Sequence, residues 1–152
     1  MTDAHLKVIT QNRRARFDYH IESKVECGIA LTGTEVKSLR ENSAQLSDSY
    51  AIGKGGELFL FNAQIPPYKP AGVLSNHEPK RTRKLLLHRR EIDRLQEAQQ
   101  KSGFALIPLS MYFKDGRVKL ELGVARGKTG VDKRDSIAER EAKREMDRAK
   151  RR

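Results

Sequence analysis

The strongest constraint on the fold is a pair of alternating segments joined by Asp115-Gly116. Apolar residues occupy every second position on both sides of this pair, namely Ile107, Leu109, Met111 and Phe113 before it and Val118, Leu120, Leu122 and Val124 after it. A period of two places these side chains on one face of each strand. Asp-Gly is a strong hairpin signal because both residues tolerate the positive φ of a tight turn. The chain must therefore contain an antiparallel hairpin with one buried face.

The same alternation appears between residues 17 and 31. Its apolar positions are Phe17, Tyr19 and Ile21, followed by Val25, Cys27, Ile29 and Leu31. Glu26, Gly28 and Ala30 fall on the opposite face of this strand. The pattern predicts that Cys27 is a small core residue rather than a nucleophile.

Two further strands are predicted around residues 44–52 and 57–65, on either side of Gly53-Lys54-Gly55-Gly56. These glycines lack the full spacing of a phosphate-binding loop, so we interpret them as a hairpin turn. The segment from Lys84 to His88 allows two interpretations. If it is extended, Leu85 and Leu87 point to the core, whereas Lys84, Leu86 and His88 share the outer face. Alternatively, the three leucines begin the next helix.

A capping box of Thr32 and Glu35 predicts one short helix, and a second helix is predicted from Arg89 to Gln100. Residues 1–11 show little pattern, and we expect them to be partly loose. The order is then three strands, a helix and two strands, with a small helix inserted after the first strand. This order predicts a mainly β fold with helices, a closed barrel of the oligonucleotide-binding (OB) type.

Residues 127–152 carry ten Lys or Arg against six acidic residues. Ser136 and Glu139 form a capping box that predicts a helix start. The apolar stripe of this helix would be narrow and is formed by Ala138, Ala142, Met146 and Ala149. An isolated helix of roughly fourteen residues is marginal in water. We therefore predict a barrel over residues 1–126 and a basic tail over 127–152, disordered when free and helical against a polyanion. A solvated terminus without function is the alternative.

The net charge of +11 and the pI near 10.0 indicate a phosphate-bearing partner. The chain has no run of eighteen apolar residues and no apolar segment typical of a signal peptide, so we expect a soluble protein and no membrane partner. Its single cysteine, Cys27, fits a reducing compartment. Together these features predict a cytoplasmic protein, and we expect a monomer.

No catalytic centre can be assembled from the sequence. The four histidines are scattered, there is no second cysteine, and no nucleophile elbow or nucleotide-binding fingerprint occurs. We therefore predict that the protein is not an enzyme and has no catalytic residues, metal or cofactor. Two segments, Arg13 to Phe17 and Arg81 to His88, instead mix basic with flat or apolar side chains, as RNA binding requires.

Five runs resemble the signature segments of one family. They are Gly33-Thr34-Glu35-Val36-Lys37-Ser38-Leu39-Arg40, Ser47-Asp48-Ser49-Tyr50, Arg81-Thr82-Arg83-Lys84-Leu85-Leu86-Leu87-His88, Gly123-Val124-Ala125-Arg126-Gly127-Lys128 and Asp132-Lys133-Arg134. In order and spacing the chain is similar to the SsrA-binding proteins, or small protein B family, of bacterial trans-translation.

The resemblance implies an OB-type barrel that binds the tRNA-like domain of transfer-messenger RNA (SsrA) and delivers it to stalled ribosomes. Ribosome rescue follows, and the nascent chain is tagged for degradation. Elongation factor Tu takes part indirectly, through the charged RNA. The tail is implied to enter the empty mRNA channel of the small subunit and to become helical at the decoding site.

The resemblance also implies two sets of functional residues. The RNA-binding set comprises Arg13, Arg14, Arg16, Phe17, Glu26, Lys37, Arg40, Arg83, Lys84, Leu86 and His88. The tail set at the decoding site comprises Gly127, Lys128, Asp132, Lys133 and Arg134. The chain departs from the family pattern at Phe17, Thr129 and Val131. The alternative function is that of another OB-type ribosomal or translation-factor RNA-binding protein.

Overall fold

The structure is a computed structural model that describes residues 6–101, 103–127 and 130–150. The strands of this described part are β1 (Leu6–Gln11), β2 (Tyr19–Ile29), β3 (Tyr50–Lys54), β4 (Glu57–Phe61), β5 (Arg83–Leu86), β6 (Phe104–Lys114) and β7 (Arg117–Gly127). The helices of the same part are α1 (Arg13–Asp18), α2 (Gly33–Glu41), the short 3-10 helix η2 (Lys69–Ala71), α3 (Arg89–Gln99) and α4 (Gly130–Lys150).

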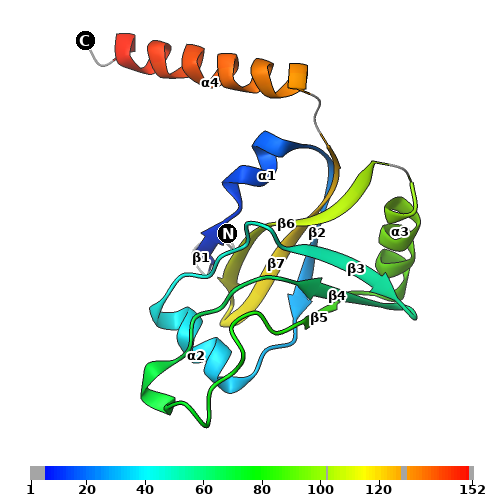
Figure 1. Cartoon of the computed structure of the whole chain (residues 1–152), viewed down its shortest axis with the longest axis vertical. Helices are drawn as coiled ribbons and strands as arrows, with labels where there is room; N and C mark the ends of the chain where they lie inside the picture. The colour runs from blue at the N-terminus through cyan, green and yellow to red at the C-terminus, as the bar shows by residue number, and fades with distance from the viewer. Residues whose placement is uncertain (1–5, 102, 128–129, 151–152) are drawn as a thin grey trace.

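The strands form one antiparallel sheet that closes on itself. Among the described residues the strand order is β1-β6-β3-β4-β5-β2-β7, and β6 also pairs with β7, so a ring of six strands results and β1 is added to β6. Figure 1 shows α2 at one end of this ring, and α1 and α4 at the other. The prediction of a mainly β fold with helices is therefore confirmed. None of the described helices is long and apolar enough to cross a membrane.

Both predicted hairpins are present. Asp115 and Gly116 adopt φ values of 51° and 78° between β6 and β7, and Lys114 pairs with Arg117. Gly55 and Gly56 adopt φ values of 62° and 79° between β3 and β4. Positive φ at both central residues matches the twist of the flanking strands, which explains the Asp-Gly and Gly-Gly pairs.

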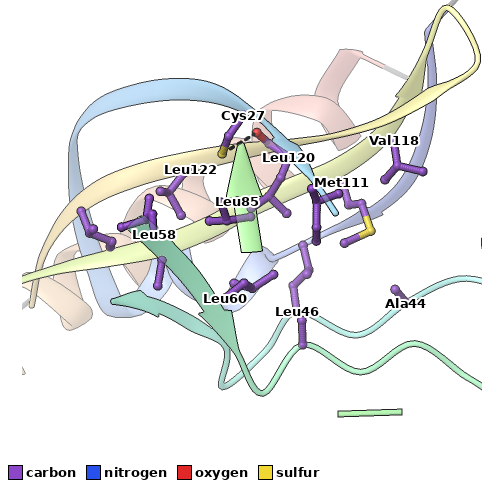
Figure 2. Close-up of a cluster of buried hydrophobic side chains, with 14 of the residues drawn as sticks. Cys27, Ala44, Leu46, Leu58, Leu60, Leu85, Met111, Val118, Leu120 and Leu122 are labelled. Carbon is purple, nitrogen blue, oxygen red and sulfur yellow. Dashed lines mark hydrogen bonds between the residues drawn. The ribbon is translucent and has the colours of Figure 1, made fainter. Parts of the chain in front are cut away.

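Leucines from several strands fill the inside of the ring, as Figure 2 shows for Leu58, Leu60 and Leu122. Cys27 lies in the same cluster, and its thiol donates a hydrogen bond of 3.4 Å to the carbonyl of Leu120. Burial raises the pKa of this thiol to about 12. Cys27 is therefore a neutral core residue at physiological pH, as its position in the alternation predicted.

The N-terminal region differs from the prediction. Residues 6–11, in the segment expected to be partly loose, form β1, which pairs with the end of β6. Arg13–Asp18, expected to lead into a strand beginning near Phe17, is the helix α1, and β2 begins only at Tyr19. The reason is Asn12, whose side-chain oxygen accepts a hydrogen bond from the backbone N–H of Ala15 and caps the helix.

The middle of the chain also differs from the prediction. The strand expected over residues 44–52 begins at Tyr50, and Gln45 makes only an isolated bridge to Gln64. Lys84 and Leu86 are exposed and Leu85 is buried, so the extended interpretation of this segment is confirmed as far as Leu86. The leucines do not begin a helix, because α3 starts at Arg89. The predicted order of elements omitted the strands β1 and β5. As a result, α3 follows β5 rather than the third predicted strand.

The tail forms a helix in this structure. α4 begins at Gly130, earlier than the predicted start at Ser136. Met146 is 62% exposed, which agrees with an apolar stripe too narrow to dock on the core. The predicted disorder of the free tail is not confirmed, and it stays a prediction.

Candidate nucleic-acid interface

Glu26 lies on the outer face of β2, in contact with two side chains of β6. The hydroxyl of Tyr112 donates a hydrogen bond of 2.5 Å to one carboxylate oxygen, and the ammonium of Lys114 lies 3.3 Å from both oxygens. The bond from Tyr112 and the charge of Lys114 lower the pKa of Glu26. The side chain is 40% exposed. Glu26 therefore presents a charged, oriented hydrogen-bond acceptor to solvent.

Leu86 lies on the same outer face, one strand away. It pairs with Gly28 across β2 and β5, and Gly28 and Glu26 point to the same side of β2. A Cβ placed on Gly28 would lie only 3.2 Å from the Cβ of Leu86, so the leucine side chain packs over this glycine. Leu86 is nevertheless 50% exposed. The structure therefore brings Glu26 and Leu86 together.

Helix α2 borders this pair. Val36 and Leu86 line one cavity of about 320 Å³, together with Gly28 and the turn after β6. Lys37 follows Val36 and is exposed, with its ammonium 5.9 Å from the ring centroid of Tyr68. Lys37 is thus an exposed cation on the helix that borders Leu86.

The basic helix α1 meets the same side of the ring. Arg13, Arg16 and Phe17 line a cavity of about 780 Å³ whose floor includes Glu121 of β7. Glu121 is the cross-strand partner of Glu26, so this cavity adjoins Glu26. Residues of α4 form its other wall, and the guanidinium of Arg140 lies 5.1 Å from the centroid of the Phe17 ring. In this structure α4 therefore covers part of the α1 surface.

The other candidates are distributed over α1, α2, β5 and the start of α3. Arg14 pairs with Asp18 at 3.2 Å and lines a different cavity. Arg40 is exposed in the last turn of α2. Lys84 pairs with Glu57 of β4 at 3.1 Å, on the outer side of β5. His88 is exposed at the start of α3, where its backbone N–H donates to Glu91.

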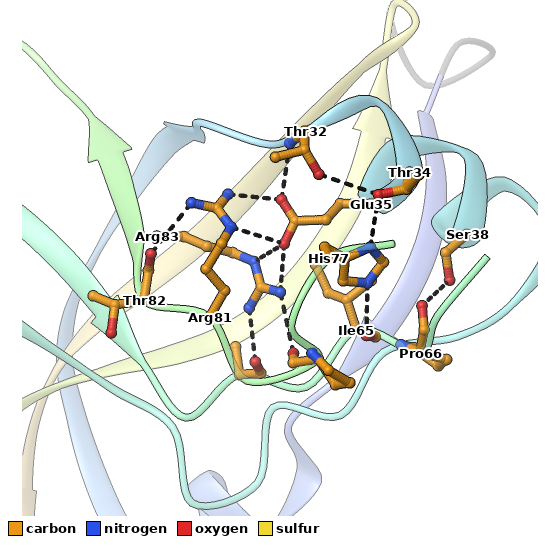
Figure 3. Close-up of polar contacts among 12 residues, drawn as sticks. Thr32, Thr34, Glu35, Ser38, Ile65, Pro66, His77, Arg81, Thr82 and Arg83 are labelled. Carbon is orange, nitrogen blue, oxygen red and sulfur yellow. Dashed lines mark hydrogen bonds and ion pairs between the residues drawn. The ribbon is translucent and has the colours of Figure 1, made fainter. Parts of the chain in front are cut away.

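Arg83 is not a surface residue, contrary to the prediction that it supports RNA binding. The alternation of β5 turns it inward with Leu85, and it is fully buried. Figure 3 shows its guanidinium directed at the carboxylate of Glu35, to which Nε donates at 2.6 Å. The other nitrogens donate to the carbonyls of Ala63 and Pro79. No phosphate can reach this guanidinium without unfolding the site, so Arg83 does not belong to the RNA-binding surface.

Glu35 is the centre of this buried network, a role that the sequence did not reveal. Besides Arg83 it accepts hydrogen bonds from Arg81 at 2.7 Å and from the backbone N–H of Thr32 at 2.8 Å. Burial would raise the pKa of Glu35, but these donors outweigh it and lower the pKa. The capping box predicted the Thr32 contact only. The network joins α2 to β5 and so fixes the strand that carries Lys84 and Leu86.

The tail residues are described only in part. Gly127 ends β7 and is exposed, and Arg134 is exposed on α4. Lys128 lies outside the described residues, as do the side chains of Asp132 and Lys133. Among the described residues there is no group of three or more His, Cys, Asp or Glu that could hold a metal ion.

Comparison with known proteins identifies the family. The model of the SmpB protein family matches residues 9–152 of this chain. The chain belongs to the SmpB family. The resemblance found in the five sequence runs is thereby confirmed.

Individual SmpB relatives agree with this assignment along nearly their whole length. A protein of Myxococcus xanthus named SsrA-binding protein is 58% identical over 147 residues, which cover 97% of this chain and 90% of the relative. A protein of the same name from Thermobifida fusca is 58% identical over 146 residues, covering 96% and 91%. A chain of the solved structure "tmRNA-SmpB: a journey to the center of the bacterial ribosome" is 45% identical, with a TM-score of 0.70 over 84% of this chain and 93% of that chain.

Proposed function

We propose that this protein binds the tRNA-like domain of transfer-messenger RNA and delivers it to stalled ribosomes for trans-translation. The observation that carries the proposal is membership of the SmpB family over residues 9–152, with relatives named SsrA-binding protein. The solved SmpB chain that it resembles belongs to a study of tmRNA-SmpB and the bacterial ribosome. The net charge of +11 supports a polyanionic partner.

We propose that the RNA-binding face is centred on Glu26 and Leu86. A charged carboxylate can accept hydrogen bonds from base amino groups, and an exposed leucine can pack against a base or ribose. The basic and aromatic side chains of α1, α2, β5 and the start of α3 would contact phosphates and bases, namely Arg13, Arg14, Arg16, Phe17, Lys37, Arg40, Lys84 and His88.

We further propose that the chain consists of an OB-type barrel and a tail that folds on the ribosome. The closed ring of β2 to β7 supports an OB-type barrel over residues 1–126. Residues 127–152 would be disordered in the free protein and would fold in the empty mRNA channel near the decoding site, using Gly127, Lys128, Asp132, Lys133 and Arg134. The exposure of α4 supports a helix that gains its stability from a partner.

The remaining features follow from this function. The RNA carries the aminoacyl group and recruits elongation factor Tu, so the protein itself needs no catalytic residue and no cofactor. We expect a cytoplasmic monomer that acts beside ribosomes.

Recovery of RNA from a bacterial lysate tests the proposal. The tagged full-length chain is used as bait, and the bound RNA is sequenced. One dominant transfer-messenger RNA is expected, and a Glu26→Ala bait should recover much less of it. Recovery of ribosomal RNA alone would contradict the proposal and favour a ribosomal or translation-factor protein.

A further inference from the structure

An aromatic strip covers the outer face of β3 and β4. Tyr50 and Phe61 are cross-strand partners, and their rings stack with centroids 5.6 Å apart and planes within 14°. Tyr50 is 37% exposed. Tyr50 belongs to the run Ser47-Asp48-Ser49-Tyr50, to which neither the buried network nor the Glu26 and Leu86 pair assigns a role.

The strip continues across the sheet toward β5. Ile52 pairs with Phe59 beside the Tyr50 and Phe61 stack, and Ile52 is 36% exposed. Phe59 in turn pairs with Lys84 of β5. Because Lys84 and Leu86 point to the same side of β5, the strip leads directly to the proposed RNA-binding face.

A basic side chain stands at each end of the strip. At one end, Tyr50 and Arg14 line a cavity of about 140 Å³ between β3 and α1. At the other end lies Lys84. The two cations are paired with Asp18 at 3.2 Å and Glu57 at 3.1 Å, respectively. The Lys84 and Glu57 pair is exposed on both sides and contributes little stability, so a phosphate can replace the Glu57 carboxylate at low cost, and Arg14 is itself largely exposed beside the half-buried Asp18.

The strip is not required to fill the core. The inward positions of β3 and β4 are Ala51, Leu58 and Leu60, which are buried. Aromatic pairs on the outside of a sheet do stabilise it through cross-strand contact. Stability alone, however, does not explain why flat rings lie between two cations on a chain of net charge +11.

We propose that the outer face of β3 and β4 binds single-stranded RNA, with an unpaired base stacked on the Tyr50 and Phe61 pair. Arg14 and Lys84 would contact the phosphates on either side. Aromatic rings between basic side chains are the arrangement with which proteins hold single strands, because every base has a flat face. The inference rests on the proposed RNA-binding function and adds a second contact surface to it.

Binding of a short single-stranded oligoribonucleotide of mixed sequence, compared with a duplex of the same sequence, tests this inference. Tyr50→Leu keeps apolar area but removes the ring, and it should weaken single-strand binding roughly tenfold while leaving duplex binding unchanged. Tyr50→Phe is the matched control and should bind the single strand as the unaltered chain does. Equal effects of Tyr50→Leu on both RNAs, or no effect, would overturn the inference.

Tryptophan fluorescence tests base stacking at position 50 even if Tyr50→Leu folds poorly. The chain contains no tryptophan, so a Tyr50→Trp variant carries a single reporter at the stack. Its fluorescence should be quenched as the single strand saturates the protein. Unchanged fluorescence at saturation, or absence of single-strand binding by the unaltered chain, would overturn the inference. Neither result would affect the proposed function, which is measured separately by recovery of transfer-messenger RNA.

Discussion

Glu26 shows why charge alone does not identify an RNA-binding residue. It is an acid on a strongly basic protein, yet Tyr112 and Lys114 hold its carboxylate in one orientation and keep it charged. A fixed acceptor distinguishes base amino groups from other base edges, whereas a lysine responds to any phosphate. At the scale of single residues, Glu26 and Leu86 should therefore determine specificity, and Lys84 should contribute affinity.

Substitution separates these two contributions. Glu26→Ala and Leu86→Ala should weaken binding of transfer-messenger RNA more than binding of a random duplex. Lys84→Ala should weaken both and reduce the salt-dependence slope by about one. Titrations of both RNAs at several salt concentrations measure the difference. A uniform loss from Glu26→Ala would show that Glu26 acts only through the structure of the sheet.

The buried pair of Glu35 and Arg83 should matter for stability. Arg83→Met removes one partner and leaves the Glu35 carboxylate buried with only Arg81 and the backbone N–H of Thr32, so it should cost about 3–5 kcal/mol of unfolding free energy. Lys84→Met is the matched control, because Lys84 is exposed on the same strand and should cost less than about 1 kcal/mol. Urea denaturation measures both values, and equal costs would contradict the importance of the buried network.

Acid should weaken the same network. The pKa of Glu35 is lower in the folded chain than its ordinary value of about 4.3, so the unfolded chain binds the proton first as the pH falls. Glu35 therefore stabilises the fold above that pH, and this contribution is lost as the pH falls through the folded pKa. The unfolding free energy of the unaltered chain should decrease below about pH 4 more steeply than that of Glu35→Gln. Equal decreases of the unfolding free energy in both chains would contradict this role of Glu35.

At the scale of elements, the sequence predicted those whose signals are local. The hairpin at Asp115-Gly116 and the alternation of β2 are short-range patterns, and both are present. β1 was missed because its pairing with β6 is a long-range contact, and α1 was missed although its cap at Asn12 is local, a cap that long-range contacts hold in place. The amide of Asn12 donates to the carbonyls of Leu46 and Pro108, which are 34 and 96 residues away. No spacing in the sequence indicates such partners.

The helix α4 should depend on a partner for most of its stability. Among the described residues, α4 meets the body at α1, where Arg140 lies over Phe17, and an exposed contact of this type contributes only about 0.5–1 kcal/mol. We therefore expect circular dichroism of the free protein to show little more helix than a chain ending at Arg126. Addition of RNA should raise the helical signal of the full chain only. A full 21-residue helical contribution without RNA would contradict the proposed disorder of the free tail.

At the scale of the whole molecule, a closed ring of strands is followed by a basic C-terminal segment. The division near residue 127 could be predicted from composition, because the apolar alternation ends at Val124 and charged residues dominate afterwards. The location of the candidate site could be predicted only in part. Alternation placed Glu26, Lys84 and Leu86 outward, but it could not place Arg83 beside Glu35 at a separation of 48 residues.

The division of labour between ring and tail is tested most directly by removing everything after Arg126. The shortened chain keeps β2, β5 and nearly all of β7, so it should bind transfer-messenger RNA with nearly unchanged affinity. Tagging of nascent chains on stalled ribosomes should be abolished, because the segment proposed to occupy the mRNA channel is gone. Equal loss of RNA binding and tagging, or tagging that survives the truncation, would contradict this account.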